Sequence, residues 1–323
     1  MSPQPLAVNP PPAIPLDCSS SVHWLDEMEH SLLHAPHSDL VPQIVDYFAE
    51  ARKLTAPERW REKCVEFREH SLVDLLHQDP FSQRAFRKPF GYAGDAGIID
   101  LIYRHPSVRD LVESSTELGR LIYETNLQQP APRAVRLRRA RIARAIDQID
   151  AGSSAQICAL GCGYLRELEE SERARGGRLG PSLALDQDSR CIESLQGHYS
   201  EFPIRFLQDG VKMMLAPPAK FHQQFHLVYA AGLFDYLSDR MGARLLAGML
   251  TMTRPGGKVL IANFLPGIVG RAYMEAVMDW WLIYRDTEQM LRLADACPTD
   301  RLAEVRVFRD ELDCVVYLEL TAA

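Results

Sequence analysis

Residues that could bind a nucleotide gather in the stretch AQICALGCGYLREL, from Ala155 to Leu168. An apolar run ends at Gly161 and Gly163, which let a backbone turn tightly and approach a ligand. The pattern predicts a buried strand, a glycine turn and then a helix whose first amide groups are free to bind an anion. Glu167 stands near the place of the third glycine that a dinucleotide loop needs. Because its carboxylate would repel a pyrophosphate, the loop disfavours NAD.

Acidic residues follow the next two predicted strands. Asp186 ends the second strand, where a carboxylate can accept hydrogen bonds from both ribose hydroxyls. Asp188 is close enough to compete, but we expect it to cap the following helix. Asp209 ends the third strand, a usual place to recognise the exocyclic amine of adenine. Each acid taken singly could be only a helix cap, but their order after successive strands favours a nucleoside site.

Aromatic residues accompany these motifs. They are Tyr92, Tyr164, Phe234, Tyr236, Trp280, Trp281 and Tyr284. An aromatic ring attracts a cation by roughly 0.5–2 kcal/mol, and a sulfonium is such a cation. From the residues alone, a place in the hydrophobic core is the alternative for Trp280, Trp281 and Tyr236. Tyr164 follows Gly163 directly, so we expect its ring beside the bound ligand.

The sequence offers no obvious general base and no spacing typical of a metal site. His226 lies inside the fourth predicted strand, where we expect a structural role, and His198 and His222 fall in a helix and a loop. No HExxH, Cys/His or GxSxG pattern is present. We therefore expect no metal and no serine nucleophile.

Two stretches with different hydrophobic patterns must position these residues. Residues 21–150 place apolar residues at helical spacing, as in VPQIVDYFAEARKL, and predict an all-helical cap interrupted by the loop KPFGYAGD (88–95). From 151 to 323 strands alternate with helices, which predicts an α/β domain with a mainly parallel, doubly wound sheet. Strands are expected at 155–160, 182–186, 204–209, 225–232, 257–264, 303–311 and 312–320, the last two as an antiparallel hairpin at one edge. Residues 1–20 are proline-rich, and we expect them to be flexible.

The composition of the chain limits the classes of molecule that it could bind. A net charge of -7 over 323 residues argues against a general nucleic-acid binder. The basic run RAVRLRRARIARA (133–145) is interpreted as a solvated helix face, with a carboxylate-binding arginine as the alternative. Seven scattered cysteines without a CxxC pair predict reduced thiols. Without a recognisable signal peptide or spanning segment, we expect a cytoplasmic protein with a small-molecule substrate and no membrane partner, and self-association into a homodimer stays open.

The order of the motifs resembles the class I S-adenosylmethionine-dependent methyltransferases from about Ala155 to the end. The stretch RPGGKVLIANF (254–264) is similar to a late turn and strand of that superfamily, although Ala159 stands where its members often have an acid. KPFGYAGD, AGLFDYL (231–237) and WWLIYRD (280–286) resemble a bacterial subgroup that includes enzymes credited with making fatty-acid methyl ester signals. Within this subgroup the chain looks most like the azetidine-2-carboxylate synthases. The resemblance implies a Rossmann-like class I methyltransferase fold and S-adenosylmethionine as the cofactor or substrate.

The resemblance also implies the residues of the site. Those expected to bind the cofactor are Gly161, Cys162, Gly163, Asp186, Gln187, Asp209, Gly210, Ala231, Phe234 and Arg133. Those expected to be catalytic are Tyr164, Asn126, Tyr92 and Tyr236. Tyr164 would stack on the sulfonium or ammonium, Asn126 would orient the amine, and Tyr92 with an arginine of the 133–139 run would hold the carboxylate. The alternative for Asn126 is a helix C-terminal or turn residue. Asp95 is expected to cap the helix that follows it.

Three functions are compatible with this interpretation. The first is intramolecular cyclisation of S-adenosylmethionine to azetidine-2-carboxylate with release of 5′-methylthioadenosine. It needs no dedicated base, because desolvation and the neighbouring sulfonium both lower the pKa of the attacking amine. The second is methyl transfer to a small carboxylate or lipid-like acceptor. The third is a non-catalytic cofactor-binding protein.

Overall fold

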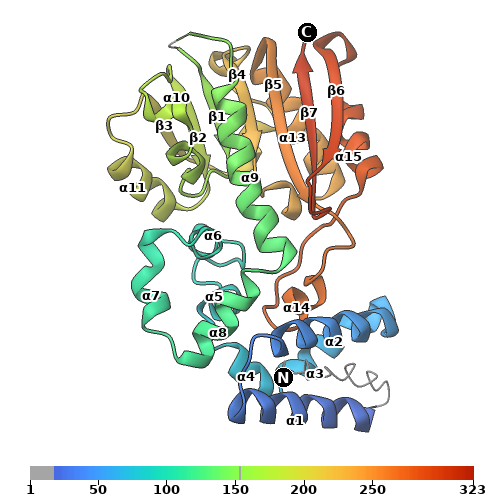
Figure 1. Ribbon diagram of the computed structural model, residues 1–323. Helices are drawn as coiled ribbons and strands as arrows, with labels where there is room; N and C mark the ends of the chain where they lie inside the picture. The colour runs from blue at the N-terminus through green and yellow to red at the C-terminus, as the bar shows by residue number, and fades with distance from the viewer. Residues whose placement is uncertain (1–17, 153) are drawn as a thin grey trace, which may run out of the picture. The chain divides into compact units, whose positions relative to one another are not determined.

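The computed structural model describes residues 18–152 and 154–323 (Figure 1). They form two compact units, each built from segments that are distant in the sequence. The helical unit comprises residues 18–87, 109–128 and 269–280, and the sheet unit comprises residues 88–108, 129–152, 154–268 and 281–323. Of the proline-rich segment expected at 1–20, residues 1–17 lie outside the described residues, and a helix begins at Cys18.

The helical unit is a bundle of amphipathic helices. Its elements are α1 (Cys18–His34), α2 (Leu40–Leu54), α3 (Pro57–Arg68), α4 (Ser71–Leu76), α5 (Pro80–Arg87), α7 (Arg109–Glu113), α8 (Glu117–Asn126) and α14 (Arg271–Ala276). Its core is aromatic: the rings of Trp24 and Tyr47 stack with centroids 4.1 Å apart, and Phe48 and Phe67 meet edge to face at 5.2 Å. Burial of such rings is the main source of stability for short helices.

The sheet unit contains a seven-stranded sheet in the order β3-β2-β1-β4-β5-β7-β6, which runs from left to right in Figure 1. The strands are β1 (Ile157–Leu160), β2 (Ser182–Asp186), β3 (Ile204–Gln208), β4 (Phe225–Ala230), β5 (Thr253–Phe264), β6 (Leu302–Arg309) and β7 (Val315–Ala322). β1 to β5 are parallel, whereas β7 is antiparallel to both β5 and β6. The expected Rossmann-like fold class, a mainly parallel doubly wound sheet with an antiparallel C-terminal edge, is confirmed.

Seven helices of the described residues belong to the sheet unit, of which the first two precede β1 and the other five lie between strands. They are α6 (Ala96–Tyr103), α9 (Pro130–Asp147), α10 (Glu172–Arg175), α11 (Ser189–His198), α12 (Val211–Met214), α13 (Asp239–Met252) and α15 (Thr287–Leu293). Short 3-10 turns supplement these helices in the sheet unit: η1 (Pro106–Val108), η2 (Arg166–Glu169), η3 (Ala219–Phe221), η4 (Phe234–Tyr236), η5 (Ala294–Ala296) and η6 (Thr299–Arg301). No helix among the described residues is long and apolar enough to cross a membrane.

The division into units differs from the boundary expected at residue 150. Residues 88–108 and 129–150, which we expected in the helical cap, belong to the sheet unit. Hydrogen bonds explain the difference, because Asp147 of α9 accepts from the hydroxyl of Ser171 at 2.6 Å and from the amide of Arg173 at 2.9 Å. Conversely, residues 269–280 belong to the helical unit, where the buried carboxylate of Glu275 accepts from Arg52 and from Trp60 at 2.7 Å each.

Candidate active site

The carboxyl ends of three neighbouring strands are joined by hydrogen bonds at the glycine turn. The carboxylate of Asp186, at the end of β2, accepts from the amide of Gly163 at 2.8 Å. The carbonyl oxygen of Asp186 accepts from the amide of Asp209, just beyond β3, at 3.0 Å. Gly161 and Gly163 have φ angles of +59° and +53°, a region that favours glycine. The sequence predicted these four residues at one site, and the structure brings them together.

Asp186 is held in place by backbone amides. Its second oxygen accepts from the amide of Asp188 at 3.0 Å, and the side chain is buried. Burial raises the pKa of the Asp186 carboxyl, while these amide hydrogen bonds oppose the shift. Asp188 caps α11 by accepting from the amide of Arg190 at 2.9 Å, as expected. The turn is therefore fixed from the β2 side before any ligand binds.

The helix expected directly after the glycine turn is absent, and that prediction is wrong. Only the 3-10 turn η2 follows, preceded by Leu165 at a φ of +51°, and α10 has four residues. Glu167 is buried and accepts from the hydroxyl of Tyr229 at 2.6 Å, so its side chain points into the sheet unit. The turn thus lacks the helix N-terminus with which dinucleotide loops bind a pyrophosphate.

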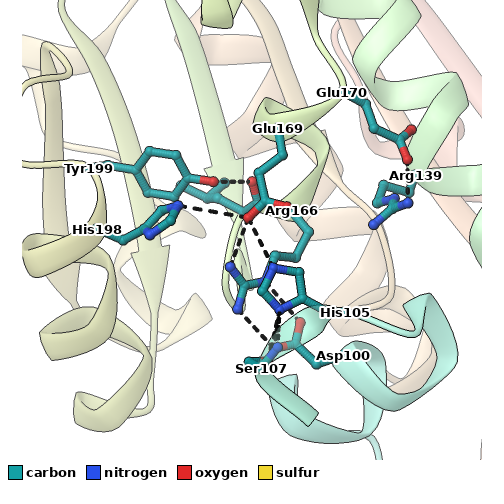
Figure 2. A network of polar contacts seen from close by, with 10 residues as sticks. Asp100, His105, Ser107, Arg139, Arg166, Glu169, Glu170, His198 and Tyr199 are labelled. Atoms are coloured by element: carbon teal, nitrogen blue, oxygen red, sulfur yellow. Dashed lines mark hydrogen bonds and ion pairs between the residues drawn. The ribbon is translucent and has the colours of Figure 1, made fainter. Parts of the chain in front are cut away.

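A network of ion pairs secures the chain beyond the turn (Figure 2). Arg166 binds the buried carboxylate of Asp100 through two nitrogens, at 2.9 and 2.8 Å, and donates to Glu169 at 2.8 Å. The ring nitrogens of His105 and His198 lie 3.5 and 3.8 Å from the same Glu169 oxygen. Sequence reasoning missed this network, because α6 is otherwise apolar around Asp100 and nothing in the spacing pairs it with Arg166.

The network also determines the surroundings of Tyr164. The Arg166 guanidinium lies 5.2 Å from the centroid of the Tyr164 ring, within the range of a cation–π contact. Tyr164 is half-buried. One face of the ring is therefore already next to a fixed cation, and a ligand cation would have to use the rest of its surface.

The loop KPFGYAGD lies close to the same strand ends. The rings of Tyr92 and Tyr236 meet edge to face with centroids 6.5 Å apart, and Tyr236 is 39% exposed. A Cβ on Gly163 would lie 3.6 Å from the Cβ of Ala96, which directly follows this loop. Burial and the neighbouring Asp186 charge raise the pKa of the Tyr92 hydroxyl. Asp95 caps α6 by accepting from the amide of Ile98 at 2.8 Å, as expected. Two residues predicted to be catalytic are thus in contact beside the glycine turn.

A second set of contacts anchors this loop. The guanidinium of Arg190 lies 3.6 Å from the centroid of the Phe90 ring and donates to the carbonyl oxygen of Pro89 at 3.0 Å. The same side chain pairs with Asp188 at 2.6 Å. Residues 89 and 90 are therefore held to the start of α11, two residues after Asp188.

The motifs AGLFDYL and WWLIYRD interlock through a buried arginine. Arg285 donates to the carbonyl oxygen of Phe234 and to the side chain of Asn263, at 2.8 Å each. The amide of Ile283 donates to the carbonyl oxygen of Asp235 at 2.7 Å. Burial raises the pKa of Asp235 to about 7, against the opposing effect of its hydrogen bond from the Phe264 amide. These motifs therefore fix the loop that follows β4.

The remaining residues predicted to bind the cofactor, and the aromatic residues near them in the sequence, differ in how exposed they are. Phe234 is completely buried beside Gly242 of α13, so its ring packs in the core and does not face a ligand. Arg133 is exposed on α9. Gln187 is exposed, Cys162 and Ala231 are half-buried, and Gly210 precedes the first residue of α12. Trp280 and Tyr284 are buried and Trp281 is half-buried.

Asn126, predicted to orient an amine, belongs to the helical unit. Its side-chain amide donates to the buried carboxylate of Asp79 at 2.9 Å, and the Ser82 hydroxyl donates to the same oxygen at 2.7 Å. The hydroxyl of Tyr273 lies 3.1 Å from that of Ser82. Burial raises the pKa of Asp79 to about 6, and the hydrogen bonds of Ser82 and Asn126 oppose the shift. Asn126 is thus the last residue of α8 and a member of a hydrogen-bonded polar cluster, which agrees with the alternative of a helix C-terminal residue.

Other polar groups lie away from the glycine turn. His226 accepts from the amide of Gln156 at 3.1 Å, in keeping with the expected structural role. A cavity of about 630 Å³ lies at the amino ends of β1, β4 and β5, and no predicted site residue lines it.

Among the described residues, one cluster has the composition of a metal site, namely Asp26, Glu29 and His70 of the helical unit. Cys64, Cys158, Cys162, Cys191, Cys297 and Cys314 are free thiols.

Comparisons with known proteins show likeness in structure. No protein-family model matches the chain, and no curated protein sequence matches it. A possible exported protein from Bordetella parapertussis is 16% identical, with a TM-score of 0.57 over 70% of this chain and 79% of its own. The N-methyltransferase NodS from Bradyrhizobium japonicum WM9, in complex with S-adenosyl-L-homocysteine, is 15% identical, with a TM-score of 0.43 over 69% of this chain and 99% of its own. The first likeness shows a shared fold alone.

Proposed function

We propose that the chain is an enzyme that binds S-adenosylmethionine at the carboxyl ends of β1, β2 and β3. The observation that supports this most directly is the double use of Asp186, whose carboxylate accepts from Gly163 and whose carbonyl oxygen accepts from Asp209. The glycine turn, a ribose-binding acid and an adenine-side acid are thereby held next to one another. Ligands of parallel α/β sheets bind at such strand ends.

The residues present fit this nucleoside. Each carboxylate oxygen of Asp186 accepts one amide hydrogen bond and keeps a lone pair for a ribose hydroxyl. Asp209 is exposed, so its carboxylate is free to accept from an exocyclic amine. The backbone of Gly161 and Gly163 offers no side chain between the turn and the ligand. When bound, S-adenosylmethionine would supply a carbon activated by its positively charged sulfur.

Calorimetric titration tests the choice of ligand. We expect S-adenosylmethionine and S-adenosylhomocysteine to bind, and NAD to bind at least about 100-fold more weakly, because the turn lacks a helix N-terminus for a pyrophosphate. Binding of NAD with equal or greater affinity would overturn the proposal.

For the reaction, we propose that the enzyme cyclises this substrate intramolecularly. The neutral α-amine forms a bond to the γ-carbon of the same molecule, the bond from that carbon to sulfur breaks, and its electron pair neutralises the sulfonium. The products are azetidine-2-carboxylate and 5′-methylthioadenosine, and the proton lost from the ammonium passes to solvent. The aromatic residues Tyr92, Tyr164 and Tyr236 support this proposal, since they would fold and desolvate the methionine arm.

Methyl transfer to a small carboxylate or lipid-like acceptor is the second candidate. The exposure of Tyr236 favours it, because a partly open rim would admit an acceptor. Incubation with S-adenosylmethionine alone separates the two reactions. Cyclisation releases 5′-methylthioadenosine without an acceptor, whereas methyl transfer yields S-adenosylhomocysteine only when an acceptor is added.

A further inference from the structure

A buried arginine of the sheet unit has no hydrogen-bond or ion-pair partner among the described residues. Arg138, in the middle of α9, is only 4% exposed. Its Nε has no hydrogen-bond partner, and the described part of the chain offers its guanidinium no hydrogen bond or ion pair. A guanidinium stays charged in proteins, and burying a charge without a partner is costly. Such a side chain is stabilised when an anionic ligand completes its surroundings.

The acids near Arg138 are already engaged elsewhere. The charge of Arg138 lowers the pKa of Glu167 and of Asp235, opposing the effect of their burial. However, Glu167 accepts from the hydroxyl of Tyr229 at 2.6 Å, and Asp235 accepts from the amide of Phe264 at 2.8 Å. The two hydrogen bonds hold these carboxylates in place without direct contact to the guanidinium.

The guanidinium lies against the loop that follows β4. Both of its terminal nitrogens are 3.5 Å from the position that a Cβ would take on Gly232, and Gly232 is half-buried. In the sheet, β4 is the neighbour of β1, and β1 is the neighbour of β2. The step from the end of β2 to the end of β4 therefore covers two strand spacings, roughly 10 Å.

We propose that Arg138 binds the carboxylate of the methionine part of S-adenosylmethionine. The inference rests on the proposed function, and it selects Arg138 among the arginines of the 133–139 run, one of which the resemblance gave this role, whereas Arg133 is exposed. With the ribose at Asp186, the nucleoside's arm runs along the Gly161–Gly163 turn of β1 toward the end of β4. The carboxylate is the only anionic group of this ligand, and the planar guanidinium can bind it through two nitrogens.

The test pairs the side chain with the ligand group that it would bind. The proteins are wild type, Arg138→Gln and Arg144→Gln, the last being a matched control because Arg144 is exposed near the C-terminal end of α9. The ligands for calorimetric titration are S-adenosylmethionine, its decarboxylated analogue and 5′-methylthioadenosine. Unfolding temperatures are measured without ligand to show that each variant is folded.

We expect wild type and Arg144→Gln to bind S-adenosylmethionine more tightly than the decarboxylated analogue, on the order of 10- to 100-fold. We expect Arg138→Gln to lose this preference while its affinity for the decarboxylated analogue changes less than about threefold. Without ligand, Arg138→Gln should unfold at the same or a higher temperature than wild type, since it removes an unpaired buried charge.

The outcomes that contradict the two proposals differ. If Arg138→Gln keeps the full preference for the carboxylated ligand, the role of Arg138 is refuted while cofactor binding stands. The same conclusion follows if Arg138→Gln weakens all three ligands equally. If wild type binds none of them, the proposed function itself fails.

Discussion

At the scale of single residues, the site depends on how Tyr164 and Asp186 are held. Tyr164 lies beside the glycine turn, and Arg166, itself bound by Asp100 and Glu169, approaches the ring from one side. The sequence made the position of Tyr164 predictable because it follows Gly163 directly. It could not predict Arg166, whose partner Asp100 is 66 residues away and meets it only in the folded unit.

Replacing the Tyr164 ring tests its role in turnover. We expect Tyr164→Ala to lower kcat on the order of 10-fold, because the contribution of one ring to holding a cation is roughly 0.5–2 kcal/mol. The Kd for S-adenosylmethionine should change less than about threefold, and Tyr164→Phe should retain most of the activity. Equal losses in kcat and binding, measured by steady-state kinetics and calorimetry, would reduce Tyr164 to a packing residue.

Removing the Asp186 carboxylate tests the ribose contact. Asp186→Ala loses the acceptor for the Gly163 amide as well as for the ribose, so we expect the affinity for S-adenosylmethionine to fall about 10- to 100-fold. Calorimetry with the wild type as reference measures the change. An unchanged Kd would show that Asp186 only fixes the turn.

At the scale of elements, hydrophobic runs made the strands predictable and tertiary contacts decided the exceptions. β2 coincides with the predicted strand at 182–186, since its residues are buried on both faces of a parallel sheet. The helix expected after Gly163 failed because Leu165 takes a left-handed conformation and Glu167 turns inward to Tyr229. Neither contact is visible in local helical spacing.

Two helical glycines give opposite predictions for the same substitution. A Cβ on Gly248 of α13 would lie 2.0 Å from the carbonyl oxygen of Met214, so Gly248→Ala must displace backbone. We expect a loss of about 2–4 kcal/mol in the free energy of unfolding. Gly197 of α11 has nothing within 4 Å of its Cβ position, so Gly197→Ala should gain about 0.5–1 kcal/mol. Urea unfolding of both variants measures this, and a destabilised Gly197→Ala or a neutral Gly248→Ala would contradict the packing described.

At the scale of the whole molecule, the chain forms two units whose segments alternate along the sequence. A boundary drawn at residue 150 follows the change from helical spacing of apolar residues to an alternation of strands and helices. It cannot reveal that Asp100 of α6 and Asp147 of α9 are hydrogen-bonded to the sheet unit, or that Glu275 binds Arg52 and Trp60 in the helical unit. Such long-range hydrogen bonds have no signature in periodicity.

Each unit contains a buried carboxyl with a raised pKa, which makes stability depend on pH. For Asp235 the folded pKa of about 7 exceeds the ordinary value of 3.8, so the folded state binds the proton more tightly than the unfolded state. Protonation therefore stabilises the fold, and this contribution grows as pH falls from about 7 to about 4. Relative to Asp235→Asn, we expect wild type to gain up to about 4 kcal/mol in unfolding free energy over this range. A pH-independent difference between the two proteins, measured by urea unfolding, would contradict the assignment.

The fate of the methyl group tests the central claim most directly. The purified protein is incubated with S-adenosylmethionine carrying a 13C-labelled methyl group and with no acceptor, and the products are identified by mass spectrometry. We predict labelled 5′-methylthioadenosine and unlabelled azetidine-2-carboxylate in equal amounts. Unchanged S-adenosylmethionine until a carboxylate or lipid-like acceptor is added, followed by transfer of the label to that acceptor, would contradict it.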